Sequence, residues 1–167
     1  MDGSETGLFV EIKKRMKIEI QEYQSIPTSG QALEFSFIST GPKGAVKKIV
    51  QFIQTPNPEI YNLAFGNFLP DGTLDDRVRN DNKDSNKVLA TVATAVHKFT
   101  SRYPARAVFF AGTTKERTRL YRMAIANRFV ESNADFEIFG LNVDGLDYDV
   151  EPFLKDKNYF AFLVKRK

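Results

Sequence analysis

The clearest candidate for chemistry lies where a short apolar run gives way to a basic amphipathic stretch. Lys115, Arg119 and Arg122 are spaced four and three residues apart, so a helix would place them on one face. Thr113 and Thr114 stand at the expected start of that helix, where unpaired main-chain amides and the positive end of the helix dipole favour an anion. The pattern predicts a phosphate-binding helix, although a solvated basic surface helix explains the same residues.

Two further lysines, Lys47 and Lys48, would extend this phosphate site if folding brings them close to the helix. They fall within an expected strand, where neighbouring side chains point to opposite faces. Nucleic acids also stack their bases on exposed aromatic rings, for which Tyr23, Tyr61, Tyr121 and Tyr159 are candidates. Core packing is the simpler interpretation of most aromatic side chains in a globular chain.

A second possible chemistry lies in the acidic segment near the C-terminus. Asp147, Asp149 and Glu151 are closely spaced carboxylates, which can bind a divalent metal, and Lys155 follows them. This set would suit a metal-dependent nuclease or hydrolase. The spacing departs from an EF-hand, and a solvated loop accounts for the same residues, so we expect no metal and no cofactor. His97, the single histidine, is interpreted as a packed helix residue.

Composition indicates one globular domain. The chain has 167 residues, of which 42% are apolar, and its 15 Phe supply core volume. It has no Cys, a net charge of +3, no signal-peptide pattern and no run of about 18 apolar residues. We therefore expect a soluble, cytoplasmic protein with no membrane partner, organised as an N-terminal extension over residues 1–30 and a domain over residues 31–167.

The elements that must position these residues change character along the chain. Strand alternation from Leu33 to Phe37, a Gly-Pro turn at 40–44 and a second run over 45–54 predict a hairpin. A third strand is expected over 61–65 and a short fourth one from residue 73. This half should be antiparallel.

The second half has helical periodicity. Apolar residues at spacings of three and four, with Ser85 as a possible cap, predict a helix that ends near Arg102, before Pro104. An apolar run over 107–111 predicts a central strand, and Thr113 with Glu116 forms a capping box for a second helix to about Ser132. Strands are expected over 136–141 and 159–164. The predicted fold class is α+β, with one mostly antiparallel sheet packed with two main helices in a single-domain sandwich.

Four segments resemble a known family. They are Gly41 to Gly44 with the two following lysines, Tyr61 to Gly66, Asp84 to Ala93, and Gly112 to Asn127. Across about Phe35 to Leu141 the chain is similar to an uncharacterised bacterial family defined only as a domain of unknown function. The resemblance implies a bacterial origin and this fold, and it assigns no catalytic residue.

These observations favour a non-catalytic protein that binds nucleic acid or another polyanion through the basic helix. Two alternatives stay open. One is a protein-interaction module, such as a homodimer formed through an exposed strand edge. The other is the metal-dependent nuclease or hydrolase that uses the acidic segment.

Overall fold

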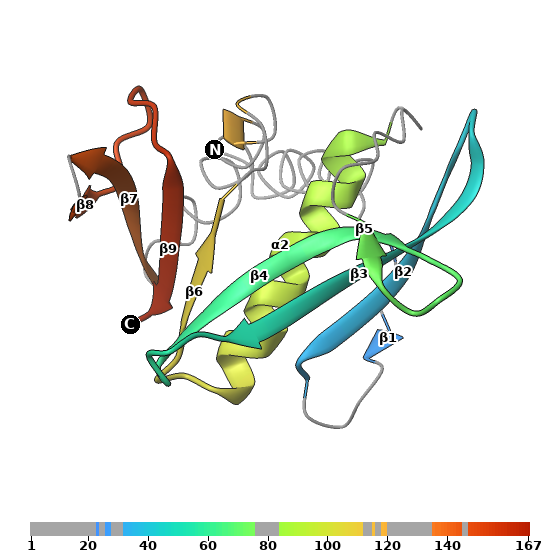
Figure 1. Ribbon diagram of the computed structural model, residues 1–167, viewed down its shortest axis with the longest axis horizontal. Coiled ribbons are helices and arrows are strands. Elements are labelled where there is room, and N and C mark those ends of the chain that lie inside the picture. Colours follow the sequence, from blue (N-terminus) through green and yellow to red (C-terminus); the bar gives the residue numbers. More distant parts are fainter. Residues whose placement is uncertain are drawn as a thin grey trace, which may run out of the picture.

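The computed structural model describes residues 23, 26–27, 32–75, 84–111, 115, 118–119, 135–144 and 147–167. These residues build nine strands and one complete helix (Figure 1). The elements are β1 (Ile26–Pro27), β2 (Glu34–Gly41), β3 (Gly44–Gln54), β4 (Ile60–Phe68), β5 (Leu74–Asp75), α2 (Ser85–Arg102), β6 (Ala107–Phe110), β7 (Phe136–Asp144), β8 (Asp147–Pro152) and β9 (Ala161–Arg166).

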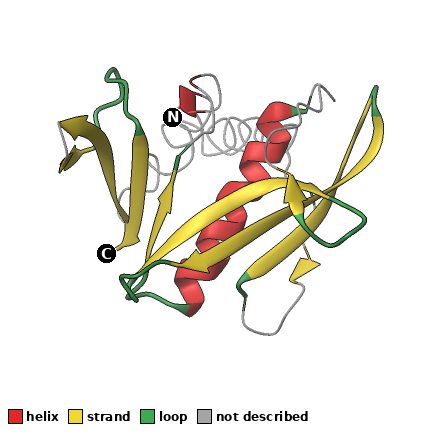
Figure 2. Cartoon of the chain, in the orientation of Figure 1, coloured by secondary structure: helices red, strands yellow, loops and turns green. Residues whose placement is uncertain are grey.

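All nine strands join one sheet in the order β1-β2-β3-β4-β6-β9-β7-β8, and β5 pairs with the end of β4. The sheet is mixed, because β4 and β6 run parallel whereas the other neighbouring strands are antiparallel. The connection from β4 to β6 passes through α2, which reverses the chain direction between them. Figure 2 shows α2 lying along one face of the sheet, behind β3 and β4.

The β2–β3 hairpin follows the expected pattern closely. Its strands close on a two-residue turn, with Gly41 opposite Gly44, and Gly44 has a φ of 88°, which suits a residue without a side chain. Phe35 and Phe37 alternate into the core and are 2% and 3% exposed. The hydrophobic alternation sets the register, because a slip by one residue would turn both rings towards solvent.

The helix α2 forms from the predicted periodic stretch and ends at Arg102, two residues before Pro104. Phe99, near the C-terminal end of α2, is fully buried, stacked on Phe52 with the ring centroids 4.2 Å apart and tilted against Tyr61 at 5.2 Å. The same face of the sheet carries the inward residues of β6, β7 and β9, including Val108, which is also fully buried. The core therefore lies between α2 and one face of the sheet.

The expected α+β sandwich, with a mostly antiparallel sheet and two main helices, is wrong. The sheet is mixed, and the described residues contain one complete helix, α2. The sequence patterns predicted α2 and β6 one by one and did not show the direction of β6 in the sheet. Because α2 returns the chain, β6 runs parallel to β4, with Ile60 opposite Ala107. Most of the second expected helix, including Thr113, Thr114 and Arg122, lies outside the described residues.

Candidate functional site

The basic segment is described at only three positions. Lys115, Thr118 and Arg119 have helical conformation, and the side chains of Lys115 and Arg119 are exposed. A spacing of four residues places these two cations on the same helix face. Because Thr113, Thr114 and Arg122 lie outside the described residues, the phosphate-binding helix stays a prediction.

The two adjacent lysines of β3 have different environments, as strand alternation requires. Lys47 is exposed, and its Nζ lies 4.4 Å from the ring centroid of Phe68. Lys48 is only 7% exposed and donates a 2.7 Å hydrogen bond to Oδ1 of Asn67, the residue directly opposite it on β4. Its Nζ also lies 5.6 Å from the ring centroid of Phe65. Lys47 can therefore meet a ligand at the surface, whereas Lys48 is part of the helix-side interior.

The tyrosines proposed for base stacking that the structure describes are largely packed inside the protein, and Tyr121 lies outside the described residues. Tyr61 and Tyr159 are each 6% exposed and belong to the core. Tyr23 stacks on Phe37 with a centroid distance of 5.6 Å, and Lys87 Nζ lies 4.2 Å from the centroid of the Tyr23 ring. These three rings stabilise the fold and do not form an exposed stacking platform.

A polar cluster that the sequence analysis missed joins the start of α2 to the sheet. Asp84 is the N-cap residue in place of Ser85, and its carboxylate makes no capping bond to the helix amides. Instead its Oδ2 accepts hydrogen bonds from the Ser39 hydroxyl at 2.5 Å and the Tyr23 hydroxyl at 2.6 Å. Tyr23 N also donates to Thr91 Oγ1 at 2.7 Å. No local sequence signal links these residues, since they are separated by up to 68 positions.

This cluster lacks the arrangement of a hydrolase. Ser39 is fully buried, so a substrate cannot reach its hydroxyl. His97 lies 13 residues after Asp84, which is roughly 20 Å along a helix at about 1.5 Å per residue, and its ring packs edge-on against Phe136 at 4.7 Å. Asp84 therefore holds the start of α2 against β2 and does not activate a nucleophile through histidine.

The acidic segment, interpreted from sequence as a loop, is the strand β8. Asp147, Asp149 and Glu151 share one side of this strand because they occupy alternate positions. Glu151 Oε1 is bound by Lys157 Nζ at 2.7 Å and by the Tyr159 hydroxyl at 2.8 Å. The described residues contain no group of three or more metal-ligating side chains able to hold an ion. The geometry therefore gives the nuclease alternative no support.

The contacts of Glu151 also shift pKa values at this end of the sheet. The Lys157 hydrogen bond, followed by that from Tyr159, lowers the pKa of Glu151, and the same contact raises the pKa of Lys157. Burial, followed by the bond to Glu151, raises the pKa of Tyr159. At neutral pH the three groups are therefore a carboxylate, an ammonium and a neutral phenol. They fix the segment after β8 against the sheet.

The opposite side of β8 carries exposed apolar side chains. Val143 on β7 stands directly opposite Tyr148 on β8, and the two are 57% and 60% exposed. Val150 is 52% exposed, and Phe160, which is 49% exposed, stacks on Tyr148 with a centroid distance of 6.3 Å. We call these four residues the β8 surface. The β8 surface faces away from α2. Ile138 of β7 packs against the core, and strand alternation places Val143 on the opposite face of β7.

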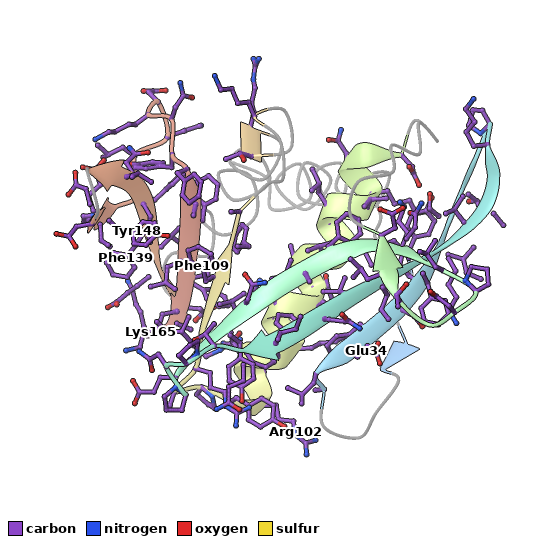
Figure 3. The ribbon with its side chains drawn as sticks, viewed as in Figure 1. Glu34, Arg102, Phe109, Phe139, Tyr148 and Lys165 are labelled. Atoms are coloured by element: carbon purple, nitrogen blue, oxygen red, sulfur yellow. The ribbon has the colours of Figure 1, made fainter. Side chains whose placement is uncertain are left out.

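The β8 surface continues inward along the same sheet face. Phe139 of β7 pairs with Leu163 of β9, which in turn pairs with Phe109 of β6. Figure 3 labels Phe109, Phe139 and Tyr148 on this side of the molecule. Phe109, Leu163 and Phe139 are half-buried. The sequence predicted β6, β7 and β9, but only the pairing reveals that these three apolar side chains form one row across the sheet, which ends beside Pro152 of the edge strand β8.

These features define a mixed-sheet protein with one helix-covered face and an apolar outer face at the β8 end. The chain belongs to the family of unknown function DUF6934, whose model matches residues 19–167. The match confirms the resemblance to a family of unknown function and extends it beyond Phe35 to Leu141. The comparisons with curated proteins and with solved structures gave no match. None of the described helices is long and apolar enough to cross a membrane.

Proposed function

We propose that the protein is a protein-interaction module that docks a partner on the β8 surface. The supporting observation is the concentration of exposed apolar side chains: among the described residues, five of the seven large hydrophobic residues that are exposed lie between Val143 and Phe160. The fifth of these is Leu154, two residues after the end of β8, at 54% exposure. Single exposed apolar residues are ordinary on a soluble protein, whereas a group of them rimmed by charge is typical of an interaction site.

The surroundings of the β8 surface also suit a docking site. Asp147 and Asp149 are exposed on the other side of the same strand, so the edge strand carries charged side chains next to the apolar ones. Exposed aromatic side chains such as Tyr148 and Phe160 contribute strongly when a partner buries them, because they remove a large area from water with few rotatable bonds. The main chain beneath is ordered by the hydrogen bonds of Glu151 and Tyr159. A partner would therefore meet a surface that is already organised.

A site-specific photo-crosslinker tests this proposal. We would replace Tyr148 with p-benzoylphenylalanine in the native cells and irradiate them. We expect a discrete adduct with one partner, which is lost when Val143 and Val150 are both changed to Ser. The purified complex of the two proteins should be weakened at least about tenfold by the same double change. The control places the crosslinker at Ile53, which is 48% exposed on β3. The same adducts from both positions, or none from Tyr148, would contradict the proposal.

Polyanion binding through the basic segment is the second candidate function. The observation that favours it is the pair Lys115 and Arg119, both exposed and on one helical face. Lys47, on the β2–β3 hairpin, belongs to a part of the fold well separated from the short helical segment near the label N in Figure 1. A phosphate would therefore be held chiefly by the basic helix.

Fluorescence anisotropy with labelled single-stranded DNA, duplex DNA and RNA at two salt concentrations tests the second candidate. Phosphate contacts release counterions, so the affinity should fall steeply as salt rises. Changing Lys115 and Arg119 together to Ala should weaken binding and reduce the salt dependence by about two phosphate contacts. The charge-matched control changes Lys155 and Lys167, which are also exposed. No binding at low salt, or equal losses in both double variants, would reject this candidate.

A further inference from the structure

We infer that the partner adds an extended strand to β8 and that this strand alternates basic and apolar residues. This inference rests on the proposed docking function and specifies the chemistry of its partner. β8 stands last in the strand order, so β7 is its one neighbour among the described strands. An edge strand of this kind offers main-chain donors and acceptors that a further strand can use.

The hydrogen-bonding pattern between β7 and β8 shows which main-chain groups of β8 point away from β7. Phe153 N donates to Ile138 O at 2.9 Å, which makes this pair a hydrogen-bonded one. Antiparallel ladders alternate between hydrogen-bonded and non-bonded pairs, so Asp147, Asp149 and Glu151 direct their main-chain groups towards β7. The main-chain N–H and C=O groups of the intervening residues point away from β7.

The outward edge is therefore short and well defined. Tyr148 and Val150 each offer one N–H and one C=O to an added strand, and Pro152 offers its carbonyl alone. Proline is tolerated here because it stands on the outer side of an edge strand. The strand that fits would pair along Tyr148 to Val150 and stop where Pro152 removes the next donor.

Side-chain alternation along β8 specifies the sequence of the incoming strand. The exposed carboxylates of Asp147 and Asp149 lie on one side, and the exposed side chains of Tyr148 and Val150 lie on the other. Directly opposite side chains on paired strands share a face. An incoming strand would thus place basic residues beside the two aspartates and apolar residues beside Tyr148 and Val150.

A second copy of β8 fits this edge poorly. Antiparallel pairing through the outward groups of two β8 strands sets Tyr148 or Val150 opposite Tyr148 or Val150 of the other copy. The acidic positions must then also stand opposite acidic positions, for example Asp149 opposite Asp149, and like charges at opposite positions are destabilising. The same carboxylates that oppose self-association would attract a basic partner strand, so charge complementarity favours a different protein.

A synthetic peptide isolates strand addition from the rest of the proposed docking. The probe is a fluorescein-labelled peptide with the core Lys-Val-Lys-Val-Lys between glycines, measured by anisotropy against the full chain. We expect salt-sensitive binding, with a Kd tighter than about 1 mM. Changing Asp147 and Asp149 to Lys should weaken binding at least about tenfold and allow a Glu-Val-Glu-Val-Glu peptide to bind instead. The control changes Glu59 and Asp135, two exposed acidic residues away from β8, to Lys.

Two readouts distinguish strand addition from simple charge attraction. On peptide binding, the amides of Tyr148 and Val150 should exchange with deuterium more slowly, whereas the Asp149 amide, which already faces β7, should change little. A peptide N-methylated at the amides of its pairing edge should lose binding. Absence of peptide binding, equal binding of the N-methylated peptide, or no added protection at Tyr148 and Val150 would overturn the inference. A specific crosslink from Tyr148 alongside any of these results would preserve the docking function and reject strand addition alone.

Discussion

Aromatic residues are buried at one end of the sheet and exposed at the other. At the end covered by α2, Phe99 of this helix is fully buried between the rings of Phe52 and Tyr61. At the β8 end, Phe160 is 49% exposed and its ring stacks on that of Tyr148, which is 60% exposed. The same residue type thus stabilises the fold at one end and stays available to a partner at the other. The difference follows from coverage, since α2 packs over only one face of the sheet.

The largest expected effect compares matched Phe→Ala changes at the two ends. Phe99→Ala should reduce the free energy of unfolding by about 3–5 kcal/mol, because it opens a cavity between stacked rings. Phe160→Ala should cost under about 1 kcal/mol, because an exposed side chain leaves no cavity. Urea denaturation of both variants measures the difference. Equal losses would mean that the β8 surface is part of the core, which would remove the comparison.

The next effect concerns the polar cluster at the covered end. Asp84→Ala removes the acceptor of the Ser39 and Tyr23 hydroxyls and should cost about 1.5–3 kcal/mol, the range for hydrogen bonds to a charged group. Asp84→Asn keeps one acceptor oxygen and should cost less. Combined with Ser39→Ala, Asp84→Ala should show a coupling energy in a double-mutant cycle. Strictly additive losses would show that the two side chains do not stabilise one another.

A smaller effect is expected from a close approach of backbone and ring near β8. A Cβ added at Gly140 would lie 2.3–2.4 Å from ring carbons of Tyr159, so the ring must move. Gly140→Ala should therefore cost about 1–3 kcal/mol, as overpacking does. In a Tyr159→Ala background the same change should cost much less, because the obstructing ring is gone. If thermal denaturation shows the same loss in both backgrounds, the close approach is not its cause.

Local patterns in the sequence predicted the covered end well. The hairpin around Gly41 and Gly44, the end of α2 at Arg102 and the opposite directions of Lys47 and Lys48 all follow from short-range sterics and alternation. What could not be predicted depends on residues far apart in the chain. Local alternation cannot say which of the two lysines is buried, because the partner Asn67 stands on another strand.

The candidate site was harder to predict for the same physical reason. Acidic residues disfavour strand structure, so the segment from Asp147 to Pro152 was interpreted as a loop, yet pairing with β7 makes it a strand. The parallel pairing of β4 with β6 was also missed, since it requires knowledge of where α2 returns the chain. The β8 surface emerges only from the pairing of β7 with β8. The predicted basic site at Lys115 and Arg119 still depends on direct binding measurements.

The smallest expected effect is a pH dependence confined to the β8 end. The Lys157 hydrogen bond lowers the pKa of Glu151 below its ordinary value of 4.5, so the folded state favours the carboxylate more than the unfolded state does. This contribution is fully present above the unfolded pKa and is lost as the pH falls through the lower folded pKa. The difference in stability between the Glu151→Gln variant and the wild type should therefore become smaller as the pH falls from neutral to about 3. Melting temperatures across this range test the sign. Asp156→Asn, at an exposed carboxylate nearby, serves as the control. A stability difference that stays constant with pH would show that the contact with Lys157 does not favour ionisation of Glu151.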